Sequence, residues 1–187
     1  MKRIGVLALQ GAVREHVQTL ESLGCEAVLV KQRSDLEKLD GLVLPGGEST
    51  TMRKLLNRYE LLEPIRTLAK QGLPMFGTCA GLILLAKDLV DYESHLAVMD
   101  VLVARNSYGR QVDSFEVKLD IPEIGPAIPA VFIRAPHIVS VGEGVEVLAE
   151  HDGKIVLAKD GHFLGCSFHP ELTEDTRILE YFVSFMV

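Results

Sequence analysis

The sequence is short of cysteine, of positive charge and of long apolar runs, and each shortage argues against a class of protein. Its three cysteines, Cys25, Cys79 and Cys166, are an odd, sparse set, which indicates a reducing compartment rather than a disulfide framework. The formal net charge of −7 argues against nucleic acid or an anionic membrane as the main partner. No stretch approaches the roughly 18 consecutive apolar residues of a spanning helix. We therefore expect a cytoplasmic protein.

The composition that is present is typical of a globular chain. With 187 residues, of which 48% are hydrophobic and 24% charged, the chain is long enough to bury a substantial core. No linker, repeat or low-complexity segment divides it. Residues 1–187 are expected to form a single domain.

The first half of the chain alternates apolar runs with helical patterns. Residues 4–9 are a continuous apolar run, as expected of a strand buried on both faces, and residues 26–30 and 41–44 are expected to form a second and a third strand. An apolar stripe at helical spacing covers residues 13–23 and is closed by Gly24. Strand, helix and strand at this spacing predict a right-handed parallel crossover.

Further helices are expected from about residue 52, over 61–71, and at the end of the chain over 174–185. Between the last two lie short strand-like runs separated by turns, at 100–104, 115–119, 130–133, 145–149, 155–158 and 163–168. Because no long helix separates these runs, antiparallel hairpins are expected. The fold class is therefore α/β, a three-layer sandwich with a mostly parallel central sheet and antiparallel hairpins in its second half.

Cys79 stands in the middle of a Gly-Thr-Cys-Ala-Gly segment at residues 77–81. The segment joins a short apolar strand at 74–76 to an apolar run at 82–86 that suits a buried helix. The pattern is that of a nucleophile elbow, in which glycines permit a tight turn and the middle side chain projects. A helix N-terminus also favours the thiolate form of a cysteine. The alternative is a buried cysteine in an ordinary strand-to-helix turn.

A second loop at residues 45–51, Pro-Gly-Gly-Glu-Ser-Thr-Thr, follows the third predicted strand. Adjacent glycines followed by hydroxyl side chains form a loop that can turn its N–H groups outward at a helix start. The alternative is a plain tight loop with a Ser or Thr cap. Ligands bind beyond the carboxyl ends of parallel strands, so this loop and Cys79 are expected to share one site.

A base and an acid for the cysteine are found near the end of the chain. His169 follows the last predicted strand, and Glu171 comes two residues later. If the segment stays extended, both side chains project to the same side, so Glu171 can bond one ring nitrogen while the other faces Cys79. A nucleophile, a base and an orienting carboxylate form a triad. The alternative for His169 is a surface histidine before a proline turn.

A metal site is not expected. In a strand of period two, Cys166 and His169 point to opposite faces, and with His162 their spacing fits no common zinc pattern. Cys25 and Cys166 are interpreted as core residues.

The order of these residues resembles one class of triad enzymes. An α/β-hydrolase places its acid before its histidine, whereas here Glu171 follows His169, as in the class I glutamine amidotransferases. Longer segments resemble one family within that class, the glutaminase subunit of the two-subunit pyridoxal 5′-phosphate synthase. These segments are Leu-Ala-Leu-Gln-Gly at 7–11 with Glu15-His16, Pro-Gly-Gly-Glu-Ser-Thr at 45–50, Gly-Thr-Cys-Ala-Gly at 77–81, Arg-Asn-Ser-Tyr-Gly-Arg-Gln at 105–111, Phe-Ile-Arg-Ala-Pro at 132–136 and Phe-His-Pro-Glu-Leu at 168–172.

The resemblance implies a fold, a reaction and roles for residues. It implies a single glutaminase domain with the class I glutamine amidotransferase-like (flavodoxin-like) fold. L-glutamine would be hydrolysed to glutamate and ammonia through a thioester on Cys79, with His169 moving protons and Glu171 holding its ring. The N–H groups of Gly47 and Ala80 are the candidates for the oxyanion hole. The chain itself would need no cofactor and would bind no pyridoxal phosphate.

The resemblance also implies a substrate site and a partner. The family's substrate positions map onto Gly47, Glu48, Ser49, Arg105, Ile133 and Arg134. An arginine suits the α-carboxylate of glutamine and Glu48 suits its α-ammonium, although surface ion pairs are the alternative for the arginines. Ammonia would pass to a barrel-shaped synthase subunit in a hetero-oligomeric complex. Gln10 and Gly11 are expected near the Gly46-Gly47 loop, where they would couple partner docking to the site.

Other functions stay open on the sequence alone. Another class I glutaminase would keep the triad and supply ammonia to a different synthase. A cysteine hydrolase or peptidase of related fold would cleave esters or peptides. A non-catalytic regulatory module would keep the fold without turnover, but an intact set of Cys79, His169 and Glu171 argues against it.

Overall fold

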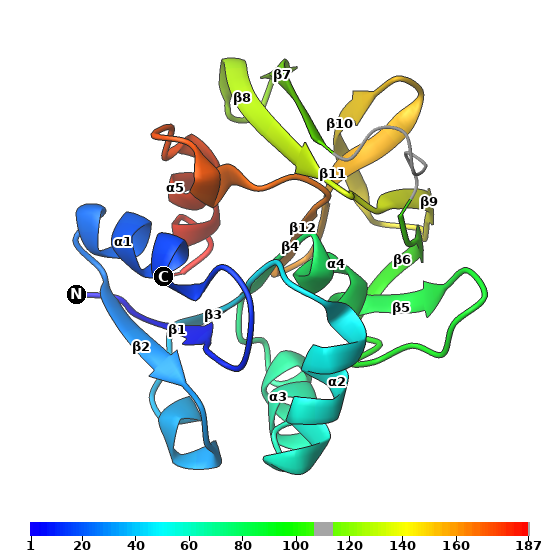
Figure 1. The fold of residues 1–187 in the computed structure, drawn as a ribbon. Coiled ribbons are helices and arrows are strands. Elements are labelled where there is room, and N and C mark those ends of the chain that lie inside the picture. The colour runs from blue at the N-terminus through cyan, green and yellow to red at the C-terminus, as the bar shows by residue number, and fades with distance from the viewer. Residues whose placement is uncertain (107–113, 187) are drawn as a thin grey trace.

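A long curled β-sheet between covering layers forms the frame of the molecule (Figure 1). The computed structural model describes residues 1–106 and 114–186. The elements follow in the order β1 (Arg3–Leu7), α1 (Val13–Ser22), β2 (Glu26–Val30), η1 (Arg33–Leu36), β3 (Gly41–Leu44), α2 (Ser49–Arg58), α3 (Leu62–Lys70), β4 (Met75–Thr78), α4 (Ala80–Leu85), β5 (Ala86–Leu89), β6 (Met99–Ala104), β7 (Ser114–Ile121), β8 (Gly125–Ile133), β9 (His137–Val141), β10 (Glu146–His151), β11 (Lys154–Asp160), β12 (Phe163–Cys166), η2 (Pro170–Leu172) and α5 (Arg177–Val183).

The sheet has a parallel part and an antiparallel part. Its order is β2-β1-β3-β4-β12-β11-β9-β6-β5, with β10 added beside β11. From β2 to β12 all neighbours are parallel, so their carboxyl ends lie at one edge. Beyond β12 the strands β11, β9 and β6 pair antiparallel, and β7 with β8 forms a separate hairpin. The expected mostly parallel sheet with later hairpins is confirmed.

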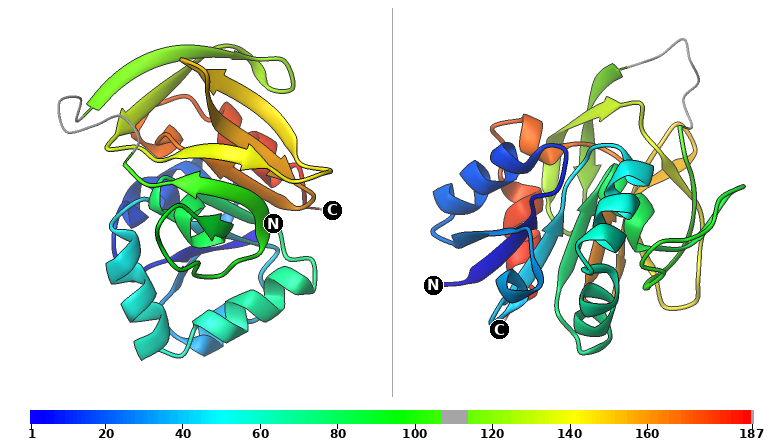
Figure 2. Two further views of the ribbon diagram at one scale, coloured as in Figure 1. Left: turned by 90° about the vertical axis from the view of Figure 1, so that its right-hand side faces the viewer. Right: turned by 60° about the horizontal axis from the view of Figure 1, so that its bottom comes forward.

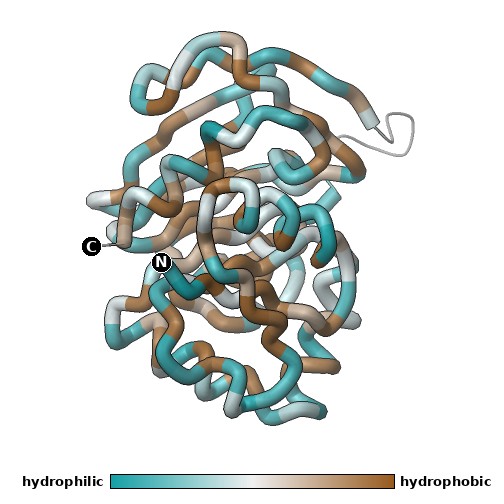
Figure 3. The backbone as a smooth tube through the Cα atoms, turned by 90° about the vertical axis from the view of Figure 1, so that its left-hand side faces the viewer, coloured by the Kyte–Doolittle hydropathy of each residue, from teal (hydrophilic) through white to brown (hydrophobic). Residues whose placement is uncertain are grey.

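Helices cover both faces of the parallel part, which gives the three expected layers. Helices α2, α3 and α4 lie on one face and α1 and α5 on the other, as Figure 1 and Figure 2 show. Because side chains alternate along a strand, Leu42 and Leu44 pack under the first group while Val43 packs under the second. Apolar segments run through the middle of the molecule in Figure 3. Strands β1, β3 and β4 thus contribute to both cores, which explains why their sequences are apolar on both faces.

Several element boundaries differ from those expected. The helix expected from about residue 52 begins at Ser49, because the Glu48 carboxylate accepts the Thr51 N–H and caps it. The run at 82–86 is split, since α4 ends at Leu85 and Ala86 opens β5. Strands β5 and β9 were not predicted, and the last helix is shorter than the pattern at 174–185.

Two of the three cysteines lie in the core, as interpreted. Cys25 is 7% exposed, and the fully buried Cys166 donates its S–H to the Phe168 carbonyl at 3.1 Å. Among the residues that the structure describes, no helix has the length and apolar character to cross a membrane.

Candidate active site

Cys79 occupies a sharp turn between β4 and α4. Its backbone has φ of 52° and ψ of −105°, a conformation that few residues other than glycine adopt. A Cβ on Gly77 would collide with the Gly81 backbone, and a Cβ on Gly81 would collide with the Leu44 carbonyl. Both flanking glycines are therefore required by close backbone approach, and the turn has the geometry of a nucleophile elbow.

His169 and Glu171 form a buried pair beside this elbow. The His169 Nδ1 atom lies 2.6 Å from Glu171 Oε1, and both residues are 7% exposed. The expected extended segment is wrong, because Pro170–Leu172 forms the 3₁₀ turn η2, with proline at its first position. The turn, rather than a strand of period two, brings the carboxylate back to the ring. The predicted contact between His169 and Glu171 is present, but the backbone between them forms a turn and not an extended segment.

The Cys79 and His169 side chains interact directly. Burial disfavours a charged His169 ring, but hydrogen bonds to Cys79 and Glu171 outweigh burial and raise the pKa of His169 to about 10. The ring is therefore protonated at neutral pH, and an imidazolium is the partner that a thiolate nucleophile needs. Gly46 makes room for this contact, since a Cβ there would collide with the His169 ring and lie 3.5 Å from Cys79 Cβ.

A cleft of about 700 Å³ opens in front of Cys79. Most of the predicted substrate and oxyanion residues line it together with three that were not predicted, the full set being Gly47, Glu48, Ser49, Cys79, Ala80, Ile83, Tyr92, Arg105, Asn106 and Arg134. Ile133 faces the nucleophile through its backbone, since its carbonyl accepts from Cys79 Sγ at 3.9 Å. As the first residue of α4, Ala80 has an N–H without an intrahelical partner, which suits an oxyanion donor.

Opposite charges stand side by side in this cleft. The Glu48 carboxylate accepts from the Thr50 hydroxyl and from the Thr51 N–H, each at 2.6 Å, and these bonds lower the pKa of Glu48 to about 2. Arg105 Nη2 lies 3.8 Å from Glu48 Oε1, and its guanidinium lies 4.0 Å from the centre of the Tyr92 ring. The cleft therefore presents a fixed anion beside a cation, which matches the charge pattern of a free amino acid.

Gln10 and Gly11 lie against the loop at 45–51, as expected. Gln10 Oε1 accepts the Glu48 N–H at 2.8 Å, and the Ala12 N–H donates to the Gly46 carbonyl at 3.0 Å. Gly11 has φ of 94° and passes so close to the Gly46 carbonyl that a Cβ would collide with it. The loop after β1 thus holds the loop after β3. The signature segment at 105–111 extends beyond Asn106, and that part lies outside the described residues.

Two functional candidates were not singled out by the sequence reasoning. Tyr92 comes from the segment after β5, and it carries no motif or spacing that would mark it. His16 is fully buried on α1 and lies 3.6 Å from Glu171 Oε2. His16 belongs to the Glu15-His16 part of the first signature segment, but the sequence does not indicate a role for it.

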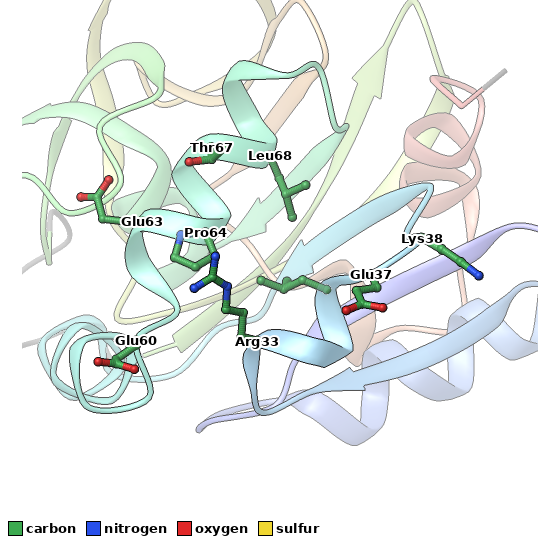
Figure 4. A pocket seen from close by; sticks show the side chains of 9 residues that line it. Arg33, Glu37, Lys38, Glu60, Glu63, Pro64, Thr67 and Leu68 are labelled. Carbon is green, nitrogen blue, oxygen red and sulfur yellow. The ribbon is translucent and has the colours of Figure 1, made fainter.

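The structure has a larger pocket away from Cys79. It measures about 800 Å³ and lies between η1 and α3, where Arg33 reaches toward Pro64 (Figure 4). None of the predicted site residues lines it. Pocket size alone would therefore select a different place from the cleft that holds the candidate catalytic side chains.

The fold and this arrangement define an α/β enzyme of the glutamine amidotransferase class, with a cysteine elbow beside a buried His–Glu pair. The chain belongs to the SNO glutamine amidotransferase family, whose model matches residues 6–187. It is similar to "Pyridoxal 5′-phosphate synthase subunit PdxT" of Geobacillus kaustophilus (strain HTA426), with 61% identity over 98% of this chain and 94% of the relative. The protein of the same name from Bacillus velezensis is 58% identical, over 98% of this chain and 94% of that one.

Solved structures agree on the fold. One described as "Crystal structure of glutamine amidotransferase" superposes with a TM-score of 0.93 and 48% identity, over 97% of each chain. A structure of PurLQS from Thermotoga maritima superposes with a TM-score of 0.74 at 18% identity, over 98% of each chain. At that identity the second likeness speaks for the fold alone.

Proposed function

We propose that this chain is the glutaminase subunit of a pyridoxal 5′-phosphate synthase and hydrolyses L-glutamine to L-glutamate and ammonia. The observation that carries the proposal is the buried His169–Glu171 pair, which meets the Cys79 elbow at the edge of a charged cleft. The curated relatives named above support the choice of synthase.

In the first half-reaction, Cys79 Sγ attacks the side-chain amide carbon of glutamine. The negative charge that develops on the amide oxygen is stabilised by the N–H groups of Gly47 and Ala80. When the C–N bond breaks, the departing nitrogen takes a proton from His169 and leaves as ammonia. The raised pKa of His169 supports this role, because the ring already holds that proton at neutral pH.

In the second half-reaction, the neutral His169 accepts a proton from water as the water attacks the thioester carbon. The C–S bond then breaks, glutamate leaves and Cys79 returns as thiolate beside a protonated ring. Glu171 stays ionised throughout and keeps Nδ1 of the ring as the donor that faces it, so that the other nitrogen serves Cys79.

Glutamine is held by its α-groups at the far side of the cleft. Arg105 and Arg134 bind the α-carboxylate, and Glu48 binds the α-ammonium, because its lowered pKa keeps it charged at any physiological pH. Gly47, Ser49 and Ile133 contact the rest of the substrate.

Ammonia passes to a barrel-shaped synthase subunit, the hetero-oligomeric partner. Docking is sensed at Gln10 and Gly11, whose contacts with the loop at 45–51 support this role. A cytoplasmic location agrees with the free thiols of all three cysteines.

The deciding experiment measures ammonia and glutamate release from L-glutamine, with and without the synthase subunit, together with mass spectrometry of the trapped thioester. We expect glutamate and ammonia in equal amounts, and the trapped thioester on Cys79. Turnover of esters or peptides but not of glutamine would make the chain a cysteine hydrolase. Stimulation by a different synthase would assign it to another amidotransferase.

A further inference from the structure

His16 lies behind the catalytic pair, on the side away from the cleft. Its side chain is fully buried on the inner face of α1, where its ring packs edge-on against Phe76 with centroids 6.5 Å apart. The Nε2 atom lies 3.3 Å from the hydroxyl of Thr78, the residue before the nucleophile, and 3.6 Å from Glu171 Oε2. A single nitrogen thus faces both the elbow strand and the orienting acid.

The surroundings determine which ring nitrogen carries hydrogen. Burial lowers the pKa of His16 although the charge of Glu171 opposes this, so the ring is neutral at pH 7 and has one N–H. A lone pair on Nε2 would face an ionised carboxylate oxygen and be repelled. The hydrogen therefore belongs on Nε2, where it points at Thr78 and Glu171, while Nδ1 has no hydrogen-bond partner among the described residues.

The Glu171 carboxylate consequently lies between two imidazole rings. Oε1 accepts from His169 at 2.6 Å, whereas Oε2 is buried, accepts no hydrogen bond from the part of the chain that the structure describes, and has His16 as its close polar neighbour. A carboxylate held at one oxygen only can rotate about its last side-chain bond. An N–H directed at the second oxygen opposes that rotation and keeps the first oxygen on His169.

We propose that His16 is a positioning residue for glutamine hydrolysis: its Nε2–H holds Glu171 in the orientation that keeps His169 directed at Cys79. The inference rests on the proposed roles of those three residues. Helix α1, which begins just after the Gln10-Gly11 loop, thereby becomes part of the catalytic support. His16 does not touch the substrate cleft, so it acts on the rate of chemistry rather than on binding.

The test compares three substitutions in the complete chain assayed with its synthase. His16→Leu removes the N–H that faces Glu171 Oε2 and should lower kcat by about 10-fold, because the second carboxylate oxygen then has no polar group directed at it, with KM nearly unchanged. His16→Gln places an amide N–H near the position of Nε2 and should restore most of the rate. His16→Asn places its amide near Nδ1 and should not.

A pH profile separates positioning from packing. The titratable groups that influence His169 are Cys79 and Glu171, and those that influence His16 are Glu171, His169 and Glu15. If Glu171 swings away in His16→Leu, His169 loses part of the support for its charge. The alkaline limb of kcat, which reports the loss of the His169 proton, should then move to lower pH. His162→Leu is the matched control, since His162 bonds the Ala69 carbonyl away from the cleft.

The outcomes distinguish this inference from the proposed function. A lower kcat in His16→Leu, together with a kcat close to that of the parent in His16→Gln, supports it. Full kcat in His16→Leu overturns it, as do equal losses in the Gln and Asn variants with unchanged pH limbs. If His16→Leu does not fold, the Gln and Asn pair decides alone. Normal turnover by Cys79→Ala would instead refute the proposed function itself.

Discussion

Glu171 Oε1 lies 2.6 Å from His169 Nδ1, and a 3₁₀ turn rather than a strand brings the two side chains together. Proline at position 170 favours that turn, because its fixed φ suits the start of a helix and its missing N–H is not needed there. The backbone N–H of His169 also donates to the Val131 carbonyl at 2.8 Å. His169, the proposed base, is thus fixed through its backbone and through its ring.

The pair predicts unequal effects of removing its members. His169→Asn should leave almost no turnover because it removes the group that moves protons. Glu171→Gln should be milder because it disturbs orientation, although members of a triad are strongly non-additive. Steady-state kcat for both variants and the parent, with melting temperatures as the check on folding, tests this. A Glu171→Gln variant slower than His169→Asn would mean that acid and base have been interchanged.

Cys79 should be the only cysteine on which activity depends. Cys79→Ala is expected to abolish ammonia release while the fold is kept, since alanine is small enough for the elbow turn. Cys25→Ser and Cys166→Ser should retain most turnover, because both thiols are buried in the core and face no substrate. Ammonia assays and circular dichroism on the three variants check this. Loss of activity confined to Cys166→Ser would contradict the assignment.

Gly46 should be required for the catalytic geometry rather than for the backbone turn. Its φ is not positive, so alanine fits the backbone, but the added Cβ would collide with the His169 ring. Gly46→Ala should therefore lose most kcat with a small change in melting temperature. The control is Gly72→Ala, where φ is 97° and the space is open. That variant should lose about 1 kcal/mol of stability and keep its turnover.

The cap on α2 should make stability depend on pH. The folded pKa of Glu48 is lowered from 4.5 to about 2, so its contribution is present above pH 4.5 and is lost as pH falls toward 2. Glu48→Gln should be less stable than the parent at pH 7, by at most about 1 kcal/mol for a half-exposed capping group. Urea unfolding from pH 7 to pH 2 should show this difference closing. Glu21→Gln, at an exposed position on α1, should show no such trend.

Much of this architecture could be predicted from the sequence because buried parallel strands are continuous apolar runs. The predicted strand at 41–44 has the same bounds as β3, and the two glycines at 77 and 81 indicate the elbow. The boundary at Ala86 could not be placed, because an apolar run continues unbroken from α4 into β5. A hydrophobicity pattern cannot mark the boundary between a helix and a strand when the residues on both sides of it are equally apolar.

The site was predicted where the chemistry is local in sequence and not where it depends on tertiary contact. His169 and Glu171 are two residues apart, so their pairing was visible. Tyr92 lines the cleft beside Arg105, whose guanidinium lies 4.0 Å from the centre of its ring although the two residues are 13 positions apart in the sequence. His16 meets Glu171 across α1 and η2, a contact that no spacing rule predicts.

From the contact between Gln10 and the loop at 45–51, we predict that the synthase partner controls activity. Gln10 Oε1 accepts the Glu48 N–H at 2.8 Å, so the Gln10 side chain is bonded to the peptide that follows Gly47. A glycine peptide can change orientation at little cost, and turning the Gly47 N–H away from the oxyanion would remove one donor. Loss of one such donor lowers kcat by about a hundredfold or more. The isolated chain is therefore expected to be a poor glutaminase.

Docking of the synthase near Gln10 should fix the Gly47 N–H in the productive orientation and raise kcat. The measurement is steady-state ammonia release by the chain alone and with saturating synthase, for the parent and for Gln10→Ala. The matched control is Gln18→Ala, which removes an exposed glutamine from α1 and should keep the stimulation. Gln10→Ala should bind the partner yet lose most of the increase in kcat. Full activity of the parent without partner would refute the switch, and unchanged stimulation of Gln10→Ala would exclude that side chain from it.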